Sequence, residues 1–401
     1  MSFPQAQSEL PPTLYWAARV EDLLQARLNA VLRRRGWTPT VLPYSGYGTD
    51  GWARVLARVV LTPPGIDQED VAGPRGWRRF FAATAADVEV TVTLGTREHI
   101  VRTERGGYLD TVLACDLPPG WGTGVLTAAG ARPRDNPVTV AVRVVAPDTL
   151  LGLVSDIDDT VLVTALPRPL VAFWNTFVRR ETSRRPVRGI ATLYQQVLAE
   201  HPDAFVVYLS TGAWNVAPAL AAFLRRFGFP DGPLLLTDWG PTAQGMFRSG
   251  PQHKRDQLRR LLAELPQLRW LFVGDDGQLD PVLYGEAAAA AEPGTVRAIA
   301  IRQLTPAEQV LTHGSPGPPA ADVAAAADTT GAGDMAAAGD MAAAGDGVGD
   351  RAAEYRSPDG FGLLAQLRAA GVLRAGDAAA DGPPRRRLRS VRRPAASSLR
   401  S

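Results

Sequence analysis

The sequence predicts an α/β domain with a buried parallel sheet, preceded by a small β-sandwich and followed by a disordered tail. Three successive patterns support this division: short β-branched runs between turn residues, then apolar runs alternating with helical patterns, then a stretch dominated by Ala, Gly, Asp and Pro. Continuous apolar strands alternating with amphipathic helices are typical of a doubly wound sheet covered on both faces. We therefore divide the 401 residues into 1–38, 39–147, 148–313 and 314–401.

The first segment, residues 1–38, is expected to contain an amphipathic helix from about residue 14 to 35. Its apolar side chains recur at helical spacing: Val20, Leu23, Leu24, Leu28, Val31 and Leu32. Packing onto the protein's own core is favoured for this face, and docking to a membrane is the alternative. The N-terminus shows no basic start followed by an apolar stretch. We therefore expect no secretory signal and a cytoplasmic location, with peripheral membrane contact left open.

The second segment, residues 39–147, has the pattern of antiparallel strands. Alternating β-branched runs occupy residues 53–60, 88–94 and 138–144, with turn residues between them. Their number and spacing indicate a small β-sandwich. Cys115 is the single cysteine, so no internal disulfide is expected. No catalytic constellation is visible here, and binding or positioning suits this domain better than chemistry.

The third segment, residues 148–313, carries the parallel-sheet pattern. Five apolar runs mark its expected strands, at residues 150–154, 205–209, 234–236, 271–273 and 298–301. Residues 257–265 have leucines on one helical face. The most apolar long window, residues 204–224, contains Ser210-Thr211-Gly212 and Pro218, so it is interpreted as strand, turn and helix rather than a membrane span.

The last segment, residues 314–401, has too few large apolar side chains to offset the entropy of ordering. The unit Gly-Asp-Met-Ala-Ala-Ala begins at Gly333 and again at Gly339, which indicates a linker rather than a calcium-binding repeat. One short helix is expected at residues 361–373. The basic run at residues 385–393 is interpreted as a solvated tail, with contact to anionic lipid or nucleic acid as the alternative. With 43 Lys and Arg against 41 Asp and Glu, no specific nucleic-acid partner is predicted.

Polar residues follow three of the predicted strands, at the sheet edge where ligands bind in such folds. They are Asp156-Ile157-Asp158-Asp159-Thr160, then Ser210-Thr211-Gly212, then Gly274-Asp275-Asp276-Gly277-Gln278-Leu279-Asp280. Lys254 opens the helix before the last of these strands. Each signal alone is weak, because clustered Asp usually forms a turn and a lone serine or lysine usually caps a helix or is solvated. A calcium-loop interpretation fails, since Val161 stands where that loop requires Gly. Together, in this order, they predict one site.

The chemistry that fits these residues is phosphoryl transfer. Asp156 is the candidate nucleophile, forming an aspartyl-phosphate, and Asp158 is the candidate acid and base. Carboxylates beside an anionic substrate require a cation, and hard oxygen ligands indicate Mg²⁺, with Asp275 as a further ligand. Ser210 and the amides beside it, with Lys254, can bind the phosphate oxygens.

These motifs, in order, resemble those of the haloacid-dehalogenase superfamily. The wider strings at residues 155–161, 208–215 and 274–281, with Pro43-Tyr44-Ser45-Gly46-Tyr47-Gly48 upstream, resemble bacterial members of the phosphatidate phosphatase catalytic-domain family first associated with fungal actin patches. The resemblance covers about residues 14 to 313. It implies a phosphoric monoester hydrolase that uses Mg²⁺ to convert phosphatidate to diacylglycerol and phosphate.

The resemblance also implies a role for each matching residue. Asp156 would be the nucleophile, Asp158 the acid and base, and Lys254 a catalytic and phosphate-binding residue. Ser210, Thr211 and Gly212 would bind phosphate. Asp156, Asp275 and the backbone carbonyl of Asp158 would hold Mg²⁺, with Thr160, Asp276 and Asp280 in support; Asp280 would orient either the metal or Lys254.

Substrate choice is less strongly indicated than chemistry. Where the fungal pattern resembles Asn-Ser-Pro-Trp, this chain has Thr211-Gly212-Ala213-Trp214. Little sequence is available for a cap, which favours an open site and a large or membrane-bound substrate. Trp174, Trp214 and Trp239, with Arg168 and Arg248, are candidates for lipid contact, although filling their own loops is favoured. The alternatives are a phosphatase for a soluble phosphoester or phosphoprotein, and a non-catalytic scaffold that binds a membrane or protein.

Overall fold

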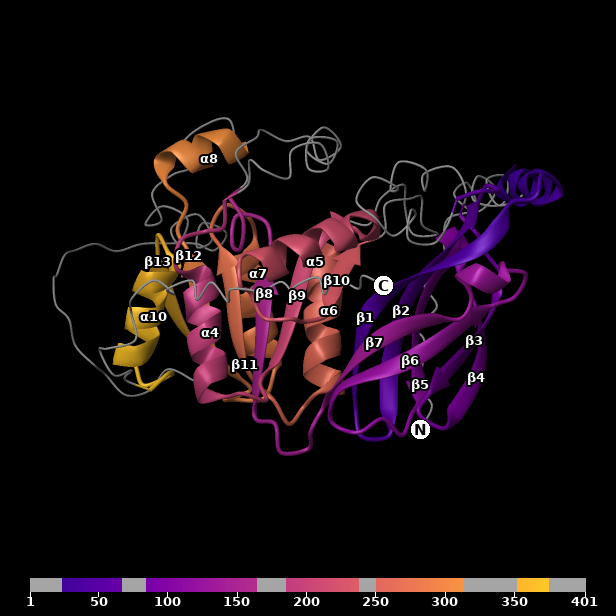
Figure 1. Cartoon of the computed structure of the whole chain (residues 1–401). Coiled ribbons are helices and arrows are strands. Elements are labelled where there is room, and N and C mark those ends of the chain that lie inside the picture. The colour runs from indigo at the N-terminus through magenta and orange to yellow at the C-terminus, as the bar shows by residue number, and fades with distance from the viewer. Residues whose placement is uncertain (1–23, 67–83, 164–184, 238–249, 314–351, 375–401) are drawn as a thin grey trace, which may run out of the picture.

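Two sheets organise the residues that the computed structural model describes, which are 24–66, 84–163, 185–237, 250–313 and 352–374. Figure 1 shows the two sheets side by side. Helices pack against the C-terminal sheet, whereas no labelled helix lies along the strands of the N-terminal sheet. In the described part of the chain, no helix is both long enough and apolar enough to cross a membrane.

Residues 24–34 form a helix, inside the range predicted for one. Its Gln25 Nε2 donates to Thr84 Oγ1 at 3.0 Å, and Asn29 Nδ2 donates to the Thr84 carbonyl at 2.8 Å. Leu32 packs against the core of the first sheet. Leu32 therefore packs on the protein as the favoured interpretation expected, whereas Leu24, Leu28 and Val31 are exposed, so that interpretation is wrong for these three apolar positions. The earlier part of the prediction, residues 14–23, lies outside the described residues.

The first sheet has seven strands in the order β4-β3-β6-β7-β1-β2-β5. Neighbouring strands are antiparallel except β1 and β7, which are parallel. Two short 3-10 turns, η2 (Arg105–Gly107) and η3 (Pro133–Asp135), connect strands. The strands are β1 (Thr38–Thr49), β2 (Trp52–Thr62), β3 (Glu89–Leu94), β4 (Arg97–Arg102), β5 (Tyr108–Ala114), β6 (Gly120–Ala128) and β7 (Val138–Val145).

This domain is one curved sheet, whereas the sequence predicted a sandwich of two. Its edge strands approach each other, because His99 Nε2 on β4 lies 2.7 Å from the carbonyl oxygen of Ala114 on β5. Alternate side chains of β3 and β7, such as Val92 and Val140, are buried in a single core. Alternation shows that one face of each strand is buried, but two stacked sheets and one curled sheet produce the same pattern.

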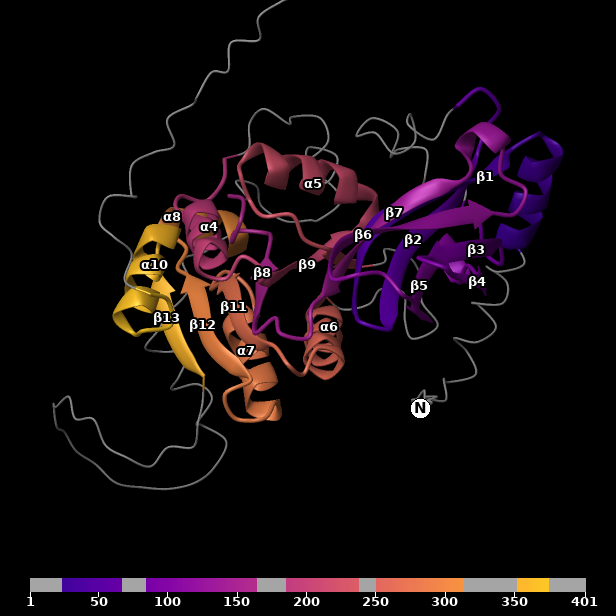
Figure 2. The same cartoon turned by 60° about the horizontal axis from the view of Figure 1, so that its bottom comes forward.

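The second sheet has six parallel strands in the order β10-β9-β8-β11-β12-β13. They are β8 (Leu151–Asp156), β9 (Phe205–Ala213), β10 (Leu234–Thr237), β11 (Arg269–Asp275), β12 (Val296–Arg302) and β13 (Ala353–Ser357). The helices are α4 (Ile190–Glu200), α5 (Ala217–Arg226), α6 (Gly250–Glu264), α7 (Asp280–Ala290), α8 (Pro306–His313) and α10 (Gly360–Ala369), with the 3-10 turn η4 (Trp214–Val216). Figure 2 shows α4, α5 and α10 on one face and α6 and α7 on the other.

The parallel-sheet domain extends beyond the boundary predicted at residue 313. Strand β13, from the segment assigned to the tail, pairs with β12 from Ala298↔Ala353 to Arg302↔Ser357. Helix α10 follows it and packs its buried leucines, Leu363 and Leu367, into the same core. The short helix expected at residues 361–373 is therefore present, but the strand was missed because its five residues, Ala-Glu-Tyr-Arg-Ser, lack the apolar run of an inner strand. Strand β13 lies at the edge of the sheet, where side chains are less buried than on an inner strand, so its sequence can be more polar.

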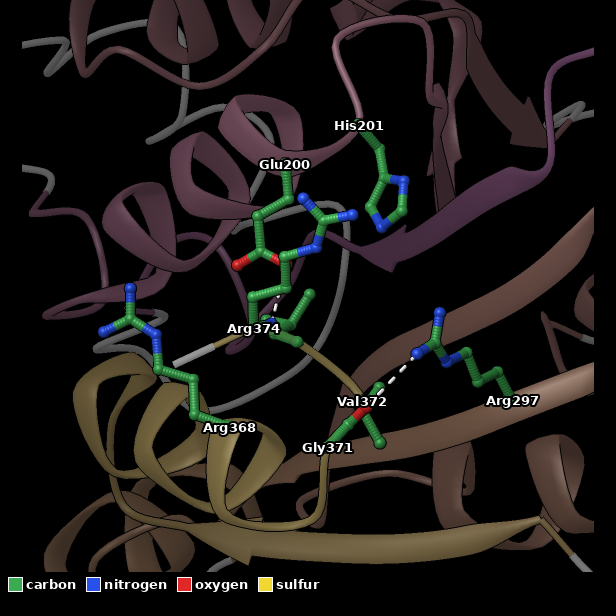
Figure 3. A pocket seen from close by; sticks show the side chains of 8 residues that line it. Glu200, His201, Arg297, Arg368, Gly371, Val372 and Arg374 are labelled. Carbon is green, nitrogen blue, oxygen red and sulfur yellow. Dashed lines mark hydrogen bonds between the residues drawn. The ribbon is translucent and has the colours of Figure 1, made fainter. Parts of the chain in front are cut away.

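A hollow of about 400 Å³ lies where α10 meets α4 and β12, at the end of the sheet opposite the predicted site. Its lining includes Glu200, His201, Arg297, Arg368 and Arg374, shown in Figure 3. Arg297 Nη2 donates to the Gly371 carbonyl at 3.3 Å, and the Arg374 amide donates to Glu200 Oε2 at 2.8 Å. These contacts attach the end of the C-terminal unit to the sheet, and the lining includes none of the predicted site residues.

The two sheets meet through a polar cluster on strands β1, β2 and β5 and helix α6. Arg54 pairs with Glu264 through Nη2, and its Nη1 lies 2.5 Å from Asp110 Oδ1. Tyr47 Oη donates to Glu264 Oε2 at 2.6 Å, and Arg260 Nη1 lies 3.0 Å from Asp110 Oδ2. Burial is the main reason that the pKa of Tyr47 lies above its usual value, so the phenol stays a donor. The motif that includes Tyr47 therefore joins the domains.

Replacing Arg54 with Met is expected to lower the free energy of unfolding by about 2 kcal/mol, because two carboxylates lose their shared cation. This value is below that for fully buried pairs, since Asp110 is 36% exposed. Arg102→Met is the matched control: Arg102 also bridges two carboxylates, Asp87 and Glu89, but is 57% exposed. Urea unfolding of both variants measures the difference. Equal losses would contradict a structural role for the cluster.

Candidate active site

The order of the parallel sheet places its ligand-binding edge between β8 and β11. From β8 the chain adds β9 and β10 on one side, and then returns to add β11 and β12 on the other. Ligands bind at the carboxyl ends of strands where the order reverses in this way. Both strands end in an aspartate, Asp156 on β8 and Asp275 on β11, and both are buried.

Lys254 joins two carboxylates at this edge. Its Nζ lies 2.6 Å from Asp156 Oδ1 and 2.5 Å from Asp280 Oδ1, and all three side chains are at most 3% exposed. Lys254 comes from the first turns of α6 and Asp280 from the first turn of α7. Of the two roles left open for Asp280, the structure shows contact with Lys254.

Asp275 completes the acidic cluster. It accepts the Gly277 amide at 2.7 Å through Oδ1 and the Thr160 hydroxyl at 3.4 Å through Oδ2. Carboxylate oxygens of Asp156, Asp275 and Asp280 lie within 4.8 Å of one another. Three carboxylates therefore face one ammonium.

Burial without enough positive charge shifts the protonation of this cluster. Burial, and next the charge of Asp280, hold the pKa of Asp156 well above its usual value, although Lys254 opposes the shift. Burial and the charges of Asp280 and Asp156 raise the pKa of Asp275 in the same way. Burial alone would lower the pKa of Lys254, but Asp156 and Asp280 raise it above its usual value. Lys254 stays charged, and the carboxylates compete for it.

Two buried oxygens of the cluster, Asp156 Oδ2 and Asp280 Oδ2, have no hydrogen-bond partner in the described part of the chain. Buried polar atoms are normally paired, so unpaired carboxylate oxygens indicate a position for a ligand. Hard oxygen donors at this spacing are those that a divalent cation uses. These three carboxylates are the residues that could hold one.

Asp158 contacts Ser210, whereas Lys254 contacts Asp156. Its Oδ2 accepts the Ser210 hydroxyl at 3.0 Å, and Ser210 Oγ in turn accepts the Gly212 amide at 2.9 Å. Asp158 is half-buried, unlike Asp156. Its carboxylate lies outside the three-carboxylate cluster, in which Asp280 occurs instead. The predicted contribution of the Asp158 backbone carbonyl to a metal site stays a prediction.

The remaining predicted residues lie at the same edge of the sheet. Thr211 contacts the start of α6 so closely that a Cβ on Gly250 would lie 2.8 Å from Thr211 Cγ2. Asp276 accepts the Leu304 amide at 2.8 Å through Oδ1, which holds the loop after β12. Burial raises the pKa of Asp276. The hydrogen bond from the Leu304 amide to Asp276 therefore supports the loop after β12.

Three polar residues that were not predicted as site residues hold the backbone at Asp156 and Asp159. Tyr194 donates to Ser155 Oγ at 2.6 Å, and Ser155 donates to the Asp156 carbonyl at 2.7 Å. Arg302 Nη1 donates to the carbonyl of Asp159 at 2.7 Å, where the φ of Asp159 is 59°. Ser155 and Arg302 donate to backbone carbonyls, and a sequence motif does not reveal contacts of this kind. A polar residue inside or directly after a buried strand, such as Ser155 or Arg302, is the signal that could have revealed them.

Trp214 contacts the first domain rather than solvent. Its ring centroid lies 4.5 Å from that of Tyr44 on β1, and both side chains are buried. This agrees with the favoured interpretation that the tryptophan fills its own surroundings. Trp174, Trp239, Arg168 and Arg248 lie outside the described residues. The β-domain thus contacts the turn that follows Ser210-Thr211-Gly212.

Comparison with known proteins matches the parallel-sheet domain. Residues 151–303 match the family model described as the catalytic domain of phosphatidate phosphatase APP1. Phosphatidate phosphatase APP1 of Saccharomyces cerevisiae is 25% identical over 153 residues, which cover 38% of this chain and 26% of that protein. An uncharacterized protein of Schizosaccharomyces pombe is 23% identical over 155 residues, 38% of this chain and 25% of that protein. The chain thus matches about a quarter of the length of each relative.

Among solved structures, a carbohydrate acetylesterase from Xanthomonas citri aligns with 66% of this chain and 68% of its own, at 10% identity and a TM-score of 0.25. At this score the alignment carries no argument about fold or function.

Proposed function

We propose that the chain is a Mg²⁺-dependent phosphatase of the haloacid-dehalogenase type that hydrolyses phosphatidate to diacylglycerol and phosphate. The observation that carries the proposal is Lys254 bound to both Asp156 and Asp280, with Asp275 beside them, at the edge where the sheet order reverses. The family match of residues 151–303 supports the substrate class.

Mg²⁺ fits the acidic cluster because two of its carboxylate oxygens are buried and unpaired within the described residues. Asp156 and Asp275 would hold the ion, as the sequence predicted, with Asp280 close to both. When bound, Mg²⁺ supplies positive charge that offsets the carboxylates and the phosphate oxygens.

The residues of the chain account for the bond changes. Lys254 holds the Asp156 carboxylate through Oδ1 and orients it for attack on phosphorus. The bond between phosphorus and the alkoxide oxygen breaks, and Asp158 gives its proton to that oxygen. Water then attacks the aspartyl-phosphate and gives a proton to Asp158, and the bond to Asp156 breaks to release phosphate. Ser210, the amides beside it and Lys254 bind the phosphate oxygens.

The test is phosphate release from vesicles that contain phosphatidate, with Mg²⁺ or with a chelator. We expect release that depends on Mg²⁺ and exceeds release from soluble esters such as phosphoserine and p-nitrophenyl phosphate. Faster release from the soluble esters or from a phosphoprotein would assign the same chemistry to another substrate. No release from any phosphomonoester would leave the scaffold alternative and contradict the proposal.

Thermal unfolding provides a separate test of the metal site. Because the pKa values of Asp156 and Asp275 are raised by folding, these groups favour the fold at low pH and lose that contribution as pH rises through their folded values. Protons also compete with Mg²⁺ for the carboxylates. We expect Mg²⁺ to raise the melting temperature more at about pH 8 than at about pH 5.5. Asp275→Asn should lose most of this increase, and an equal increase at both pH values would contradict the site.

A further inference from the structure

The helix at residues 24–34 carries an apolar stripe that the described part of the chain leaves exposed. Leu24 is 61% exposed, Leu28 41% and Val31 43%. Their spacing of four and then three residues places them on one side of the helix. The residues that attach the helix to the sheet, Gln25 and Asn29, lie on another side. An exposed apolar stripe on an anchored helix indicates an interaction surface.

Within the described helix, the charged side chains around this stripe are all positive, and Glu21 and Asp22 precede the helix in the sequence. Residues 24–36 include four arginines and no acidic residue. Arg27, Arg33, Arg34 and Arg35 are exposed, and none forms an ion pair within the described residues. Arg27 and Arg34 are seven residues apart, about two helical turns, so both lie on the same side of the stripe, next to Val31. Apolar side chains flanked by arginines are the arrangement of helices that lie in the surface of anionic membranes.

The helix also lies at a suitable end of the molecule. Figure 1 shows it at the same end as the carboxyl ends of β8 and β9, where Asp156 and Ser210 lie. The helix and the candidate active site therefore lie at the same end of the molecule.

We propose that residues 24–34 dock on the surface of an anionic phospholipid bilayer. Leu24, Leu28 and Val31 enter the boundary between headgroups and acyl chains, and Arg27 and Arg34 contact the anionic headgroups. This inference rests on the proposed function in one respect: the bilayer would present the substrate to the site. A partner protein would be expected to bring acidic side chains to these arginines, but an anionic bilayer supplies that charge without a specific partner.

The test uses the full chain and vesicles without phosphatidate, so that binding does not depend on turnover. Vesicles of phosphatidylcholine alone are compared with vesicles containing about 30% phosphatidylserine, and the bound protein is sedimented. We expect binding to the anionic vesicles, reduced about tenfold by Leu28→Asp and similarly by the Arg27→Gln and Arg34→Gln double substitution. The control is Ile100→Asp on β4, which replaces an apolar side chain that is 67% exposed and lies outside the helix at residues 24–34.

Wild-type protein that leaves the anionic vesicles unbound, or Leu28→Asp protein that binds like wild type, would overturn the proposal. The two arginine substitutions keep the test valid if Leu28→Asp impairs folding, because all these arginine side chains are exposed. Failure of the proposed function has a different signature. A protein that binds phosphatidylserine vesicles but releases no phosphate from phosphatidate would retain the docking surface and lose the enzymatic assignment.

Discussion

Asp156→Asn is expected to reduce Mg²⁺-dependent phosphate release by at least about 10⁴-fold while the protein stays folded. An amide has nearly the shape of the carboxylate but cannot form the aspartyl-phosphate. The measurement is single-turnover phosphate release from phosphatidate vesicles. Asp256→Asn is the matched control, because Asp256 lies on α6 two residues after Lys254 and contacts only exposed side chains, Gln252 and Arg259, among the described residues. Unchanged activity of Asp156→Asn would contradict the assignment.

The same substitution should not destabilise the protein when Mg²⁺ is removed by a chelator. Asp156 is one of three buried carboxylates that share one lysine. Its replacement lowers the repulsion on Asp275, whose pKa is raised partly by Asp156. We therefore expect the free energy of unfolding in chelator to equal or exceed that of wild type. A large loss of stability would show that the pair with Lys254 outweighs the repulsion.

Lys254→Met is expected to have the opposite effect on stability, lowering the free energy of unfolding by about 3 kcal/mol or more at neutral pH. It removes the cation between Asp156 and Asp280, both almost fully buried. The loss should be smaller at low pH, where protons neutralise the carboxylates, and smaller with Mg²⁺, which supplies charge. Phosphate release should also fall by about 10³-fold, since Lys254 orients the nucleophile and binds phosphate.

The matched control for Lys254→Met is Arg255→Met, on the next residue of the same helix. Arg255 pairs with Glu286 at 2.6 Å, but their side chains are 34% and 47% exposed, whereas that of Lys254 is buried. Loss of Arg255 should leave stability and activity near those of wild type. Urea unfolding in chelator and in Mg²⁺ measures both variants. If the two substitutions cost the same, the buried position of Lys254 has no energetic consequence.

The parallel-sheet domain was the part most accessible to prediction. Its strands β9 and β11 fall on apolar runs long enough to be recognised, and helices separate them. Because the carboxyl ends of parallel strands share one edge, Asp156, Ser210 and Asp275 could be placed together from their positions after such runs. Lys254 could be included because it opens the helix that leads to β11.

Other features depended on contacts between segments far apart in the chain. Nothing local to Asp280 shows that it binds Lys254, and the hydrogen bond from Arg302 to the Asp159 carbonyl joins residues on different strands and loops. The curvature of the first sheet depends on which edges approach, which alternation does not encode. Haloacid-dehalogenase membership, Mg²⁺ and the phosphatidate substrate remain predictions until the experiments above are done.

Strand β13 has a consequence for synthesis of the protein on the ribosome. Its partner β12 ends at Arg302, but β13 begins about 50 residues later, at Ala353. At translation rates of about 5–20 residues per second, the edge of β12 waits about 3–10 seconds for its final strand. During that interval its amides and carbonyls are available to other nascent chains. The outer edge of β12 is therefore most open to mispairing in the interval between its own synthesis and that of β13.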